Sequence, residues 1–251
     1  MSNDTWELVN GAVTLVDDLV LKPARPWSPT VHALLTYLRS QGLQCVPEPV
    51  GIRDDVEAMR VVEGDAGPDA WRHQVSEAAV RSAGALLRRV HDATEGFEPP
   101  EGAEWAFAAT PGATVVTHGD PGPWNFVWRD GEAVALVDWD YAVPAPAMDD
   151  VAYAVDTFAP FRSDDELRES HGFDAPPDRA ARVHAFAEAY GLGGTSGLVD
   201  RVVDRQNTTL TRITDLAERG HEPWASWVRA GYIDELRGRV RWTREHRHLV
   251  E

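Results

Sequence analysis

A short polar loop near the middle of the chain most constrains how it can fold. The segment 117–125 reads THGDPGPWN, and its two prolines and two glycines are incompatible with a helix. Apolar runs at 113–117 and 133–137 flank the loop, and each is typical of a short strand. A second polar stretch, ALVDWD at 135–140, follows. The chain must therefore place a histidine, three carboxylates and an amide in loops between short strands.

Composition excludes several classes of function. The chain has 251 residues, of which 43% are apolar, enough for one domain or two closely packed lobes. Its 41 acids and 24 bases give a net charge of −17, which opposes binding to nucleic acid or an anionic membrane and favours a cationic partner. The single cysteine, Cys45, cannot form an intrachain disulfide. With no leader-like or membrane-spanning run, we expect a cytoplasmic protein without an obligate protein partner.

The spacing of apolar residues changes along the chain. Short β-branched or aliphatic runs at 13–16, 19–22 and 57–62 predict a small antiparallel sheet, with a turn at Asp17-Asp18. A helix is predicted over 28–42, with Ser28 as its N-cap and Gly42 after its end. The pattern therefore begins as a mixture of strands and helix.

Helical spacing dominates the rest of the chain. A second helix is predicted over 69–92, followed by short strands at 113–117, 125–128 and 133–137, the last two joined across Asp130-Gly131. From Met148 the spacing is helical almost to the end, with loops at 162–178 and 191–197. Together these patterns predict the α+β class.

Three polar residues have the spacing that phosphoryl transfer requires. Asp120 is followed by Asn125 and then by Asp138, at the end of the next hairpin. Protein kinases combine His-Arg-Asp-x-x-x-x-Asn with a later aspartate, and His118-Gly-Asp120 keeps the distance to Asn125. We expect Asp120 to be the base and Asn125 and Asp138 to hold Mg²⁺. The alternative for the Asp-Pro-Gly-Pro loop is an ordinary turn, for which this composition is also suitable, and the alternative for Asp140 is a structural role.

The segment HGDPGPWN, followed by ALVDWDYAVPAPAMDDVAYA, resembles the catalytic and metal-binding segments of the aminoglycoside phosphotransferase and choline kinase superfamily. The resemblance implies a two-lobed protein-kinase-like fold. Its small N-terminal sheet lobe, including the hinge, would span 1–64, and its mainly helical C-terminal lobe, which binds the acceptor, would span 65–251. The donor would be ATP with Mg²⁺, with GTP left open. His118 would brace the loop, and Asp150 would steady it unless Asp150 is an ordinary N-cap.

The N-terminal segment agrees with this family in outline. Lys22, the only lysine of the chain, stands where the resemblance places a cation on the nucleotide phosphates. The segment Met59, Arg60, Val61, Val62 and Glu63 resembles the hinge whose backbone binds adenine. Two family features are missing. The glycine-rich loop is reduced to Gly11, and the helix at 28–42 offers His32 but no glutamate to pair with Lys22.

The resemblance and the charge together predict a phosphotransferase that acts on a small cationic acceptor, such as an aminoglycoside or a basic peptide antibiotic. Four acids of the helical segment are candidates for binding it: Asp156, Asp164, Asp165 and Glu166. A kinase of a small metabolite such as choline is the alternative, and so is a kinase-like immunity protein without turnover. A metal-dependent phosphoesterase using His118, Asp120 and His246-x-His248 is a weaker alternative.

Overall fold

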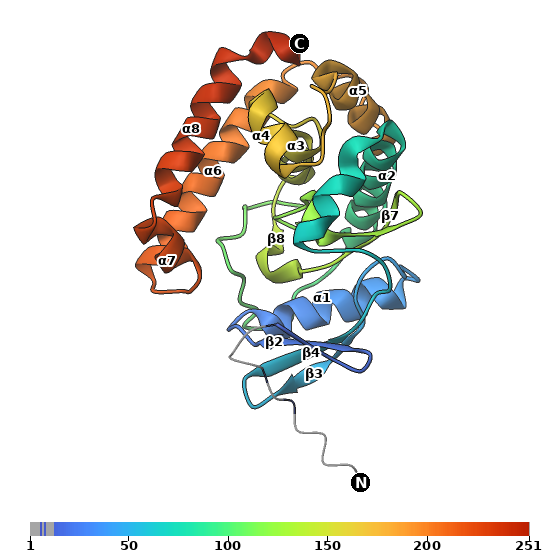
Figure 1. Ribbon diagram of the computed structural model, residues 1–251. Helices are drawn as coiled ribbons and strands as arrows, with labels where there is room; N and C mark the ends of the chain where they lie inside the picture. The colour runs from blue at the N-terminus through green and yellow to red at the C-terminus, as the bar shows by residue number, and fades with distance from the viewer. Residues whose placement is uncertain (1–5, 7, 9–12, 251) are drawn as a thin grey trace.

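The protein is described by a computed structural model that covers residues 6, 8 and 13–250. A four-stranded antiparallel sheet and one helix form a small lobe, and the larger remainder is mainly helical (Figure 1). Gly11, which the sequence suggests as the remnant of a phosphate-binding loop, lies outside the described residues.

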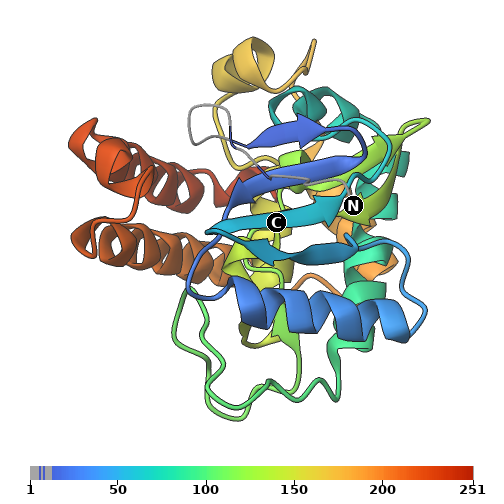
Figure 2. The same cartoon turned by 90° about the horizontal axis from the view of Figure 1, so that it is seen from below.

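Two hairpins build the sheet of the small lobe, in the order β1-β2-β4-β3 (Figure 2). β1 (Thr14–Val16) and β2 (Leu19–Pro23) join across Asp17, confirming the predicted turn. β3 (Pro49–Arg53) and β4 (Val56–Arg60) join across Asp54 and Asp55, which have φ of 47° and 62°. The sequence did not predict β3, because Pro49 and Gly51 both weaken a strand pattern.

Helix α1 (Ser28–Ser40) lies between the sheet and the helical lobe (Figure 1). Its N-cap is Trp27, one residue before the predicted Ser28, whose hydroxyl instead accepts the backbone N–H of Arg25 at 2.9 Å. Gly42 follows the helix end with φ of 85°, as expected. The buried side of α1, which includes Leu34 and Leu35, joins a hydrophobic core that continues into the helical lobe. The core therefore runs through the junction of the lobes.

The chain crosses between the lobes after β4 and then lies tightly against strand β6 (Phe126–Arg129). Gly64 has φ of 134°, and a Cβ there would approach Val127 Cγ1 to 2.6 Å and the Trp128 carbonyl oxygen to 2.7 Å. Asp65 and Trp128 exchange two backbone hydrogen bonds, of 2.9 and 2.8 Å. Glycine is required at position 64 because both its conformation and the available space exclude a side chain.

The helix predicted over 69–92 is divided in two. A 3-10 helix, η2 (Pro68–Val75), precedes α2 (Glu77–Thr94). Between them Ser76 is extended, and its hydroxyl accepts the backbone N–H of Ala79 at 3.1 Å. Ser76 thus starts a new helix with its own N-cap, while the apolar spacing continues across the break.

Short strands and 3-10 turns surround the polar loop. β5 (Val116–Thr117) pairs with β8 (Val143–Pro144), and β6 pairs with β7 (Glu132–Leu136). The β6–β7 hairpin turns at Asp130-Gly131, which confirms the prediction. The 3-10 turns η3 (Pro123–Asn125) and η4 (Trp139–Tyr141) complete this region.

The remaining elements are helical: α3 (Ala147–Phe158), α4 (Asp164–Ser170), α5 (Arg179–Tyr190), α6 (Leu198–Glu218), α7 (Trp224–Arg229), α8 (Tyr232–Glu245) and the 3-10 turn η5 (Arg247–Leu249). α2 packs on α5, while α6 packs on α3, α7 and α8 (Figure 1). α4 lies within the loop predicted at 162–178, because Ser163 caps its first turn. Over the part of the chain that the structure describes, no helix combines the length and apolar character needed to cross a membrane.

Candidate active site

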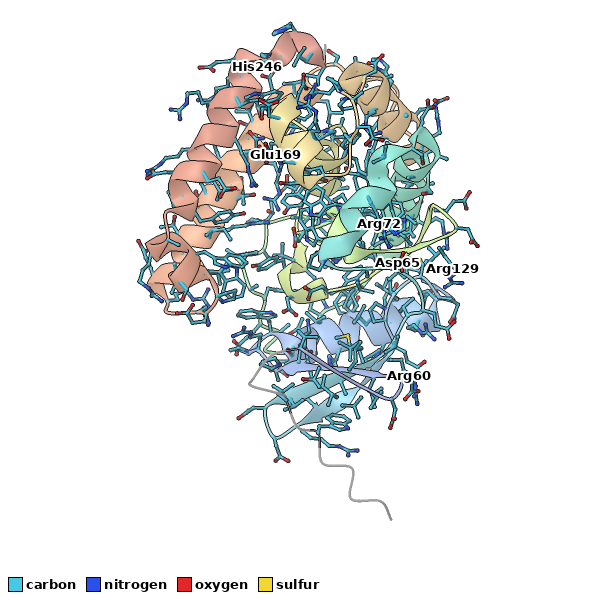
Figure 3. The ribbon with its side chains drawn as sticks, in the orientation of Figure 1. Arg60, Asp65, Arg72, Arg129, Glu169 and His246 are labelled. Carbon is cyan, nitrogen blue, oxygen red and sulfur yellow. The ribbon has the colours of Figure 1, made fainter. Side chains whose placement is uncertain are left out.

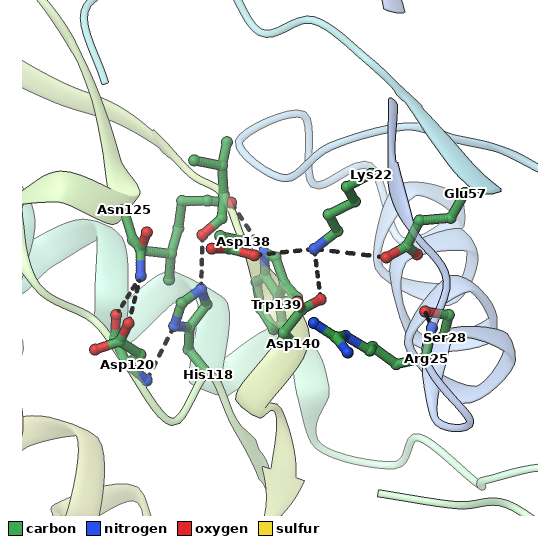
Figure 4. Close-up of polar contacts among 12 residues, drawn as sticks. Lys22, Arg25, Ser28, Glu57, His118, Asp120, Asn125, Asp138, Trp139 and Asp140 are labelled. Carbon is green, nitrogen blue, oxygen red and sulfur yellow. Dashed lines mark hydrogen bonds and ion pairs between the residues drawn. The ribbon is translucent and has the colours of Figure 1, made fainter. Parts of the chain in front are cut away.

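Asp120 is held in the loop between β5 and η3 by neighbours that donate to its carboxylate. Asn125 Nδ2 donates to Oδ2 at 2.9 Å (Figure 4), and Trp124 Nε1 donates to the same atom at 3.3 Å. The Tyr153 hydroxyl of α3 also hydrogen-bonds the carboxylate. Burial raises the pKa of Asp120 to about 6, so the group accepts a proton more readily than an exposed aspartate.

Asp150 of α3 is fully buried beneath this loop. Its carboxylate accepts the backbone N–H groups of His118 at 2.6 Å and Gly119 at 2.8 Å, and Nε2 of His91 lies 3.1 Å away. Pro146 is the N-cap of α3, so Asp150 is not the N-cap that the sequence left as an alternative. Nδ1 of His91 lies 2.7 Å from the hydroxyl of Tyr190, which extends the network to α5. Sequence reasoning did not single out His91.

Gly119 is the position where the loop comes closest to η4. Its φ is 86°, and a Cβ would overlap the carbonyl oxygen of Tyr141. Arg205 of α6 donates to the Gly119 carbonyl oxygen at 2.6 Å. The loop is therefore fixed from below by Asp150 and from the side by Arg205.

His118 connects this loop to the segment that carries Asp138. Its Nε2 donates to the Val137 carbonyl at 2.9 Å, and its Nδ1 accepts the backbone N–H of Asp120 at 3.2 Å (Figure 4). Burial lowers the pKa of His118, which keeps the ring neutral with one donor and one acceptor. The Val137 N–H also donates to the Asn125 carbonyl oxygen at 2.8 Å.

Asn125 and Asp138 line one cavity, which is the arrangement their predicted role requires. The amide nitrogen of Asn125 is used by Asp120, so its side-chain oxygen is the atom left to bind a cation. Asp138 adopts a left-handed conformation with φ of 60°, which costs on the order of 1–3 kcal/mol and is typical of functional sites. The described residues contain no cluster of three or more His, Cys, Asp or Glu able to hold a metal. Amide and carboxylate oxygens nevertheless fit Mg²⁺, which usually completes its shell with water and phosphate.

Lys22 on β2 reaches three carboxylates. Its ammonium lies 2.9 Å from Asp138, 3.6 Å from Glu57 and in direct contact with Asp140 (Figure 4). Although burial opposes the charge, these carboxylates raise the pKa of Lys22 above its usual value. Lys22 is therefore a fixed cation beside the proposed metal ligands.

The glutamate that appeared to be missing comes from a strand. Glu57 on β4 pairs in register with Lys22 on β2, and its second oxygen lies 3.0 Å from Nε2 of His32 on α1. The helix thus contributes a histidine that orients the glutamate, and the strand contributes the glutamate itself. The sequence-based search failed because it looked for a glutamate on the helix only.

The predicted hinge lies where the two lobes join. Met59 and Arg60 end β4, and Val61, Val62 and Glu63 carry the chain across. Figure 3 shows Arg60 on the small lobe, with Asp65 and Arg129 at the junction; Arg129 donates to the Glu63 carbonyl oxygen at 3.1 Å. Binding of adenine by this segment stays a prediction.

The four acids expected to bind a cationic acceptor are paired within the chain. Asp164, Asp165 and Glu166 begin α4 rather than occupying a loop, because Ser163 caps a helix there. Their partners are arginines: Asp156 and Glu166 lie beside Arg162, Asp164 beside Arg179, and Asp165 beside Arg168. None of the four lines the cavity beside Asp120, although Asp156 and Glu166 each line a cavity that adjoins it. The expected acidic funnel is therefore not formed by these described residues.

A cavity of about 490 Å³ opens beside Asp120 and is lined instead by arginine and aromatic side chains. Three pairs define what we call the arginine–aromatic wall: Arg25 with Trp224, Arg205 with Tyr153, and Arg212 with Phe107. Sequence reasoning missed all six residues, since they come from separate parts of the chain and form no local motif.

His246, which the phosphoesterase alternative would need beside His118, is far from this cavity. Figure 3 shows His246 at the outer end of the helical lobe, remote from the junction of the lobes. Its ring stacks on Trp242 with a centroid distance of 4.4 Å, and its Nδ1 donates to the Trp242 carbonyl oxygen at 2.8 Å. His246 therefore caps a helix end and does not join His118.

Comparison with known proteins identifies a family and a relative that this chain resembles in sequence. The model of the phosphotransferase enzyme family matches residues 1–107 and 99–184. The trifolitoxin immunity protein of Rhizobium leguminosarum bv. trifolii is 36% identical over 214 residues, which cover 80% of this chain and 80% of that protein. The resemblance inferred from the catalytic segments is thus confirmed at the level of the family.

Solved structures share the fold at low sequence identity. A choline/ethanolamine kinase family protein from Mesorhizobium loti has a TM-score of 0.53 and 15% identity, and covers 97% of this chain and 93% of its own. Spectinomycin phosphotransferase, solved with ADP and spectinomycin, has a TM-score of 0.56 and 10% identity, with coverages of 90% and 84%. A putative aminoglycoside phosphotransferase from Ralstonia eutropha has a TM-score of 0.54 and 15% identity, with coverages of 90% and 86%. These likenesses confirm the predicted kinase-like α+β fold.

Proposed function

The chain belongs to the phosphotransferase enzyme family, and from this premise we propose that it transfers the terminal phosphoryl group of ATP to a hydroxyl of a small molecule. One observation carries the proposal: Lys22, Asp120, Asn125 and Asp138 meet at one site although they come from both lobes. A structural role for each residue alone would not require them to meet.

Each of these residues has a role that its surroundings support. Asp120 orients the acceptor hydroxyl and accepts its proton, and a pKa of about 6 suits a base that works near neutral pH. Lys22 places a fixed positive charge for the nucleotide phosphates. Asn125 and Asp138 would hold Mg²⁺, which neutralises charge on the transferred phosphoryl group when bound. The hinge at 59–63 would hold adenine through its backbone.

A resistance-type role is supported by the relative that is named as an immunity protein. We propose that the acceptor is a toxin or antibiotic that phosphorylation inactivates. An immunity protein that binds the toxin without turnover is the second candidate, and the name of that relative favours it equally. A cationic acceptor, expected from the net charge, lacks the free acids that would bind it beside Asp120.

Direct binding of Mg·ATP tests the proposal without knowledge of the acceptor. The wild-type protein should bind Mg·ATP in calorimetry, and Asp138→Asn should weaken this binding while Asp130→Asn, in the exposed β6–β7 turn, should not. Failure of the wild-type protein to bind any Mg·nucleotide would contradict the proposal.

A cell-based measurement separates the two candidates. Expression of the chain in a trifolitoxin-sensitive strain should protect it, and Asp120→Asn should remove the protection if turnover is required. Protection that survives Asp120→Asn would favour binding without catalysis.

A further inference from the structure

The cavity beside Asp120 is lined by three arginines as well as by three aspartates. Its arginine–aromatic wall contains Arg25, Arg205 and Arg212, and none of these forms an ion pair with a carboxylate of the described residues. The acids that line the same cavity are Asp120, which is the proposed base, and Asp138 and Asp140, which contact Lys22. The arginines are therefore the charges left for a ligand.

Arg205 is almost entirely buried, with 6% of its surface exposed. Its Nη2 donates to the Gly119 carbonyl oxygen, and its guanidinium lies 4.7 Å from the ring centroid of Tyr153. The Nε atom of Arg205 is buried without a hydrogen-bond partner among the described residues. A buried guanidinium donor is costly to leave unpaired, so this atom indicates an acceptor group that the described residues do not supply.

Arg212 and Arg25 flank the same cavity on aromatic rings. The guanidinium of Arg212 lies 4.6 Å from the ring centroid of Phe107, and that of Arg25 lies 5.6 Å from Trp224. Asp149 and Asp150 act on Arg212 from outside the cavity, and Asp150 is already bonded to the catalytic loop. Flat guanidinium groups fixed on rings suit bidentate recognition of a planar oxyanion, while the rings suit a planar apolar body.

Resting on the phosphotransferase function proposed above, we infer that the acceptor is a hydroxylated molecule with a planar apolar part and a carboxylate-type anion, and is not a polycation. The anion would pair with Arg212 and Arg25, which places the hydroxyl toward Asp120. The net charge of −17 does not oppose this, because long-range fields are screened beyond about 8 Å at physiological salt, whereas the arginines act in direct contact.

Three probes of one shape test the charge preference: 3-phenyllactate, phenylalaninol and 3-phenylpropanol. Each has a ring and a hydroxyl. 3-Phenyllactate also carries a carboxylate, phenylalaninol carries an ammonium, and 3-phenylpropanol carries no charge. Calorimetry should show that 3-phenyllactate binds at least about tenfold more tightly than 3-phenylpropanol, and that phenylalaninol and kanamycin bind more weakly still.

Arg212→Gln should remove about tenfold of the affinity for 3-phenyllactate, with little change for 3-phenylpropanol or Mg·ATP. Arg25→Gln is a second variant, from the other lobe, and should act in the same direction. Arg201→Gln is the matched control, since Arg201 is an exposed residue of the same helix α6 that does not line the cavity.

Each outcome decides the inference. Equal affinity for the three probes, tighter binding of kanamycin, or a preference unchanged in Arg212→Gln and Arg25→Gln would overturn it. Loss of Mg·ATP affinity in Arg212→Gln with 3-phenyllactate unaffected would also overturn it, because the arginines would then serve the nucleotide. If 3-phenyllactate binds as expected but Mg·ATP never does, the inference stands and the proposed function fails. Phosphorylation of kanamycin in preference to anionic acceptors would mean that the proposed function stands and the inference fails.

Discussion

The two sides of the cleft around Asp120 differ in charge and in origin. The metal-side wall consists of Lys22, Glu57, Asn125, Asp138 and Asp140, in which one cation is surrounded by carboxylates. The arginine–aromatic wall has the opposite character, with cations that lack carboxylate partners in the described chain. The first wall contains the residues proposed for phosphoryl transfer, whereas the second contains those proposed to bind the acceptor. Under the two proposals, chemistry and acceptor choice depend on different residues, and each can be changed separately.

The largest effect is expected from Asp120, which lies between the two walls. Asp120→Asn keeps the size of the side chain but removes the proton acceptor, so kcat should fall by about 10²- to 10⁴-fold. Affinities for Mg·ATP and for the acceptor should change little, as calorimetry would show. Turnover close to that of the wild type would mean that Asp120 is not the base and that the two walls do not meet at it.

A change at Asp138 should affect the metal-side wall alone. Asp138→Asn tolerates the left-handed conformation but removes one ligand charge, so Mg·ATP affinity should fall by about 10- to 100-fold. Affinity for 3-phenyllactate should be unaffected. The two walls would not be independent if Asp138→Asn weakened both ligands equally.

Two substitutions of Lys22 distinguish the effect of its charge from the effect of its geometry on the metal-side wall. Lys22→Ala should weaken ATP binding by about tenfold, and Lys22→Arg should restore part of this loss through charge alone. Titration of ATP into the three proteins checks the order wild type, Arg, Ala. Equal affinities would assign Lys22 only to the stability of the Glu57 and Asp140 contacts.

The last effect concerns stability rather than ligand binding, in the cavity that His171 lines together with Asn125 and Asp138. Burial, with help from Arg162, lowers the pKa of His171 to about 4. Between this value and the unfolded value of about 6.5, only the unfolded state binds the proton, so stability should decrease as pH falls through that range. His171 should account for a loss on the order of 2 kcal/mol at pH 4 relative to pH 7, measured in urea unfolding as the difference between the wild type and His171→Gln. His171→Gln should flatten this part of the profile, and an unchanged profile would contradict the assignment.

The metal-side wall was largely predictable because its residues lie in continuous segments. The spacing from Asp120 to Asn125 sets both on one loop, and the Asp130-Gly131 hairpin returns Asp138 to that loop. Glu57 escaped prediction because its partner Lys22 is on a neighbouring strand, and strand register is not visible in a local pattern.

The arginine–aromatic wall could not be predicted for a different reason. Arg25 precedes α1, Tyr153 is on α3, Arg212 on α6 and Trp224 on α7, so only tertiary packing brings them together. The net charge predicted a cationic ligand and gave no indication of the arginines in this cavity, since a composition average does not locate charge. Acids such as Asp164, Asp165 and Glu166 are paired with arginines and do not line this cavity.

The position of Lys22 affects how a metal cation can bind beside Asp138 and Asp140. Its ammonium is in contact with Asp138 and Asp140, so the nucleotide-free protein carries its own counterion where a divalent cation would bind. Binding of magnesium alone would bring two cations together, and we expect it to be weak. Under the proposed function, the triphosphate would give the ammonium a new anionic partner and release the aspartates. Loading of the site would then be an ion exchange, in which nucleotide and metal bind together.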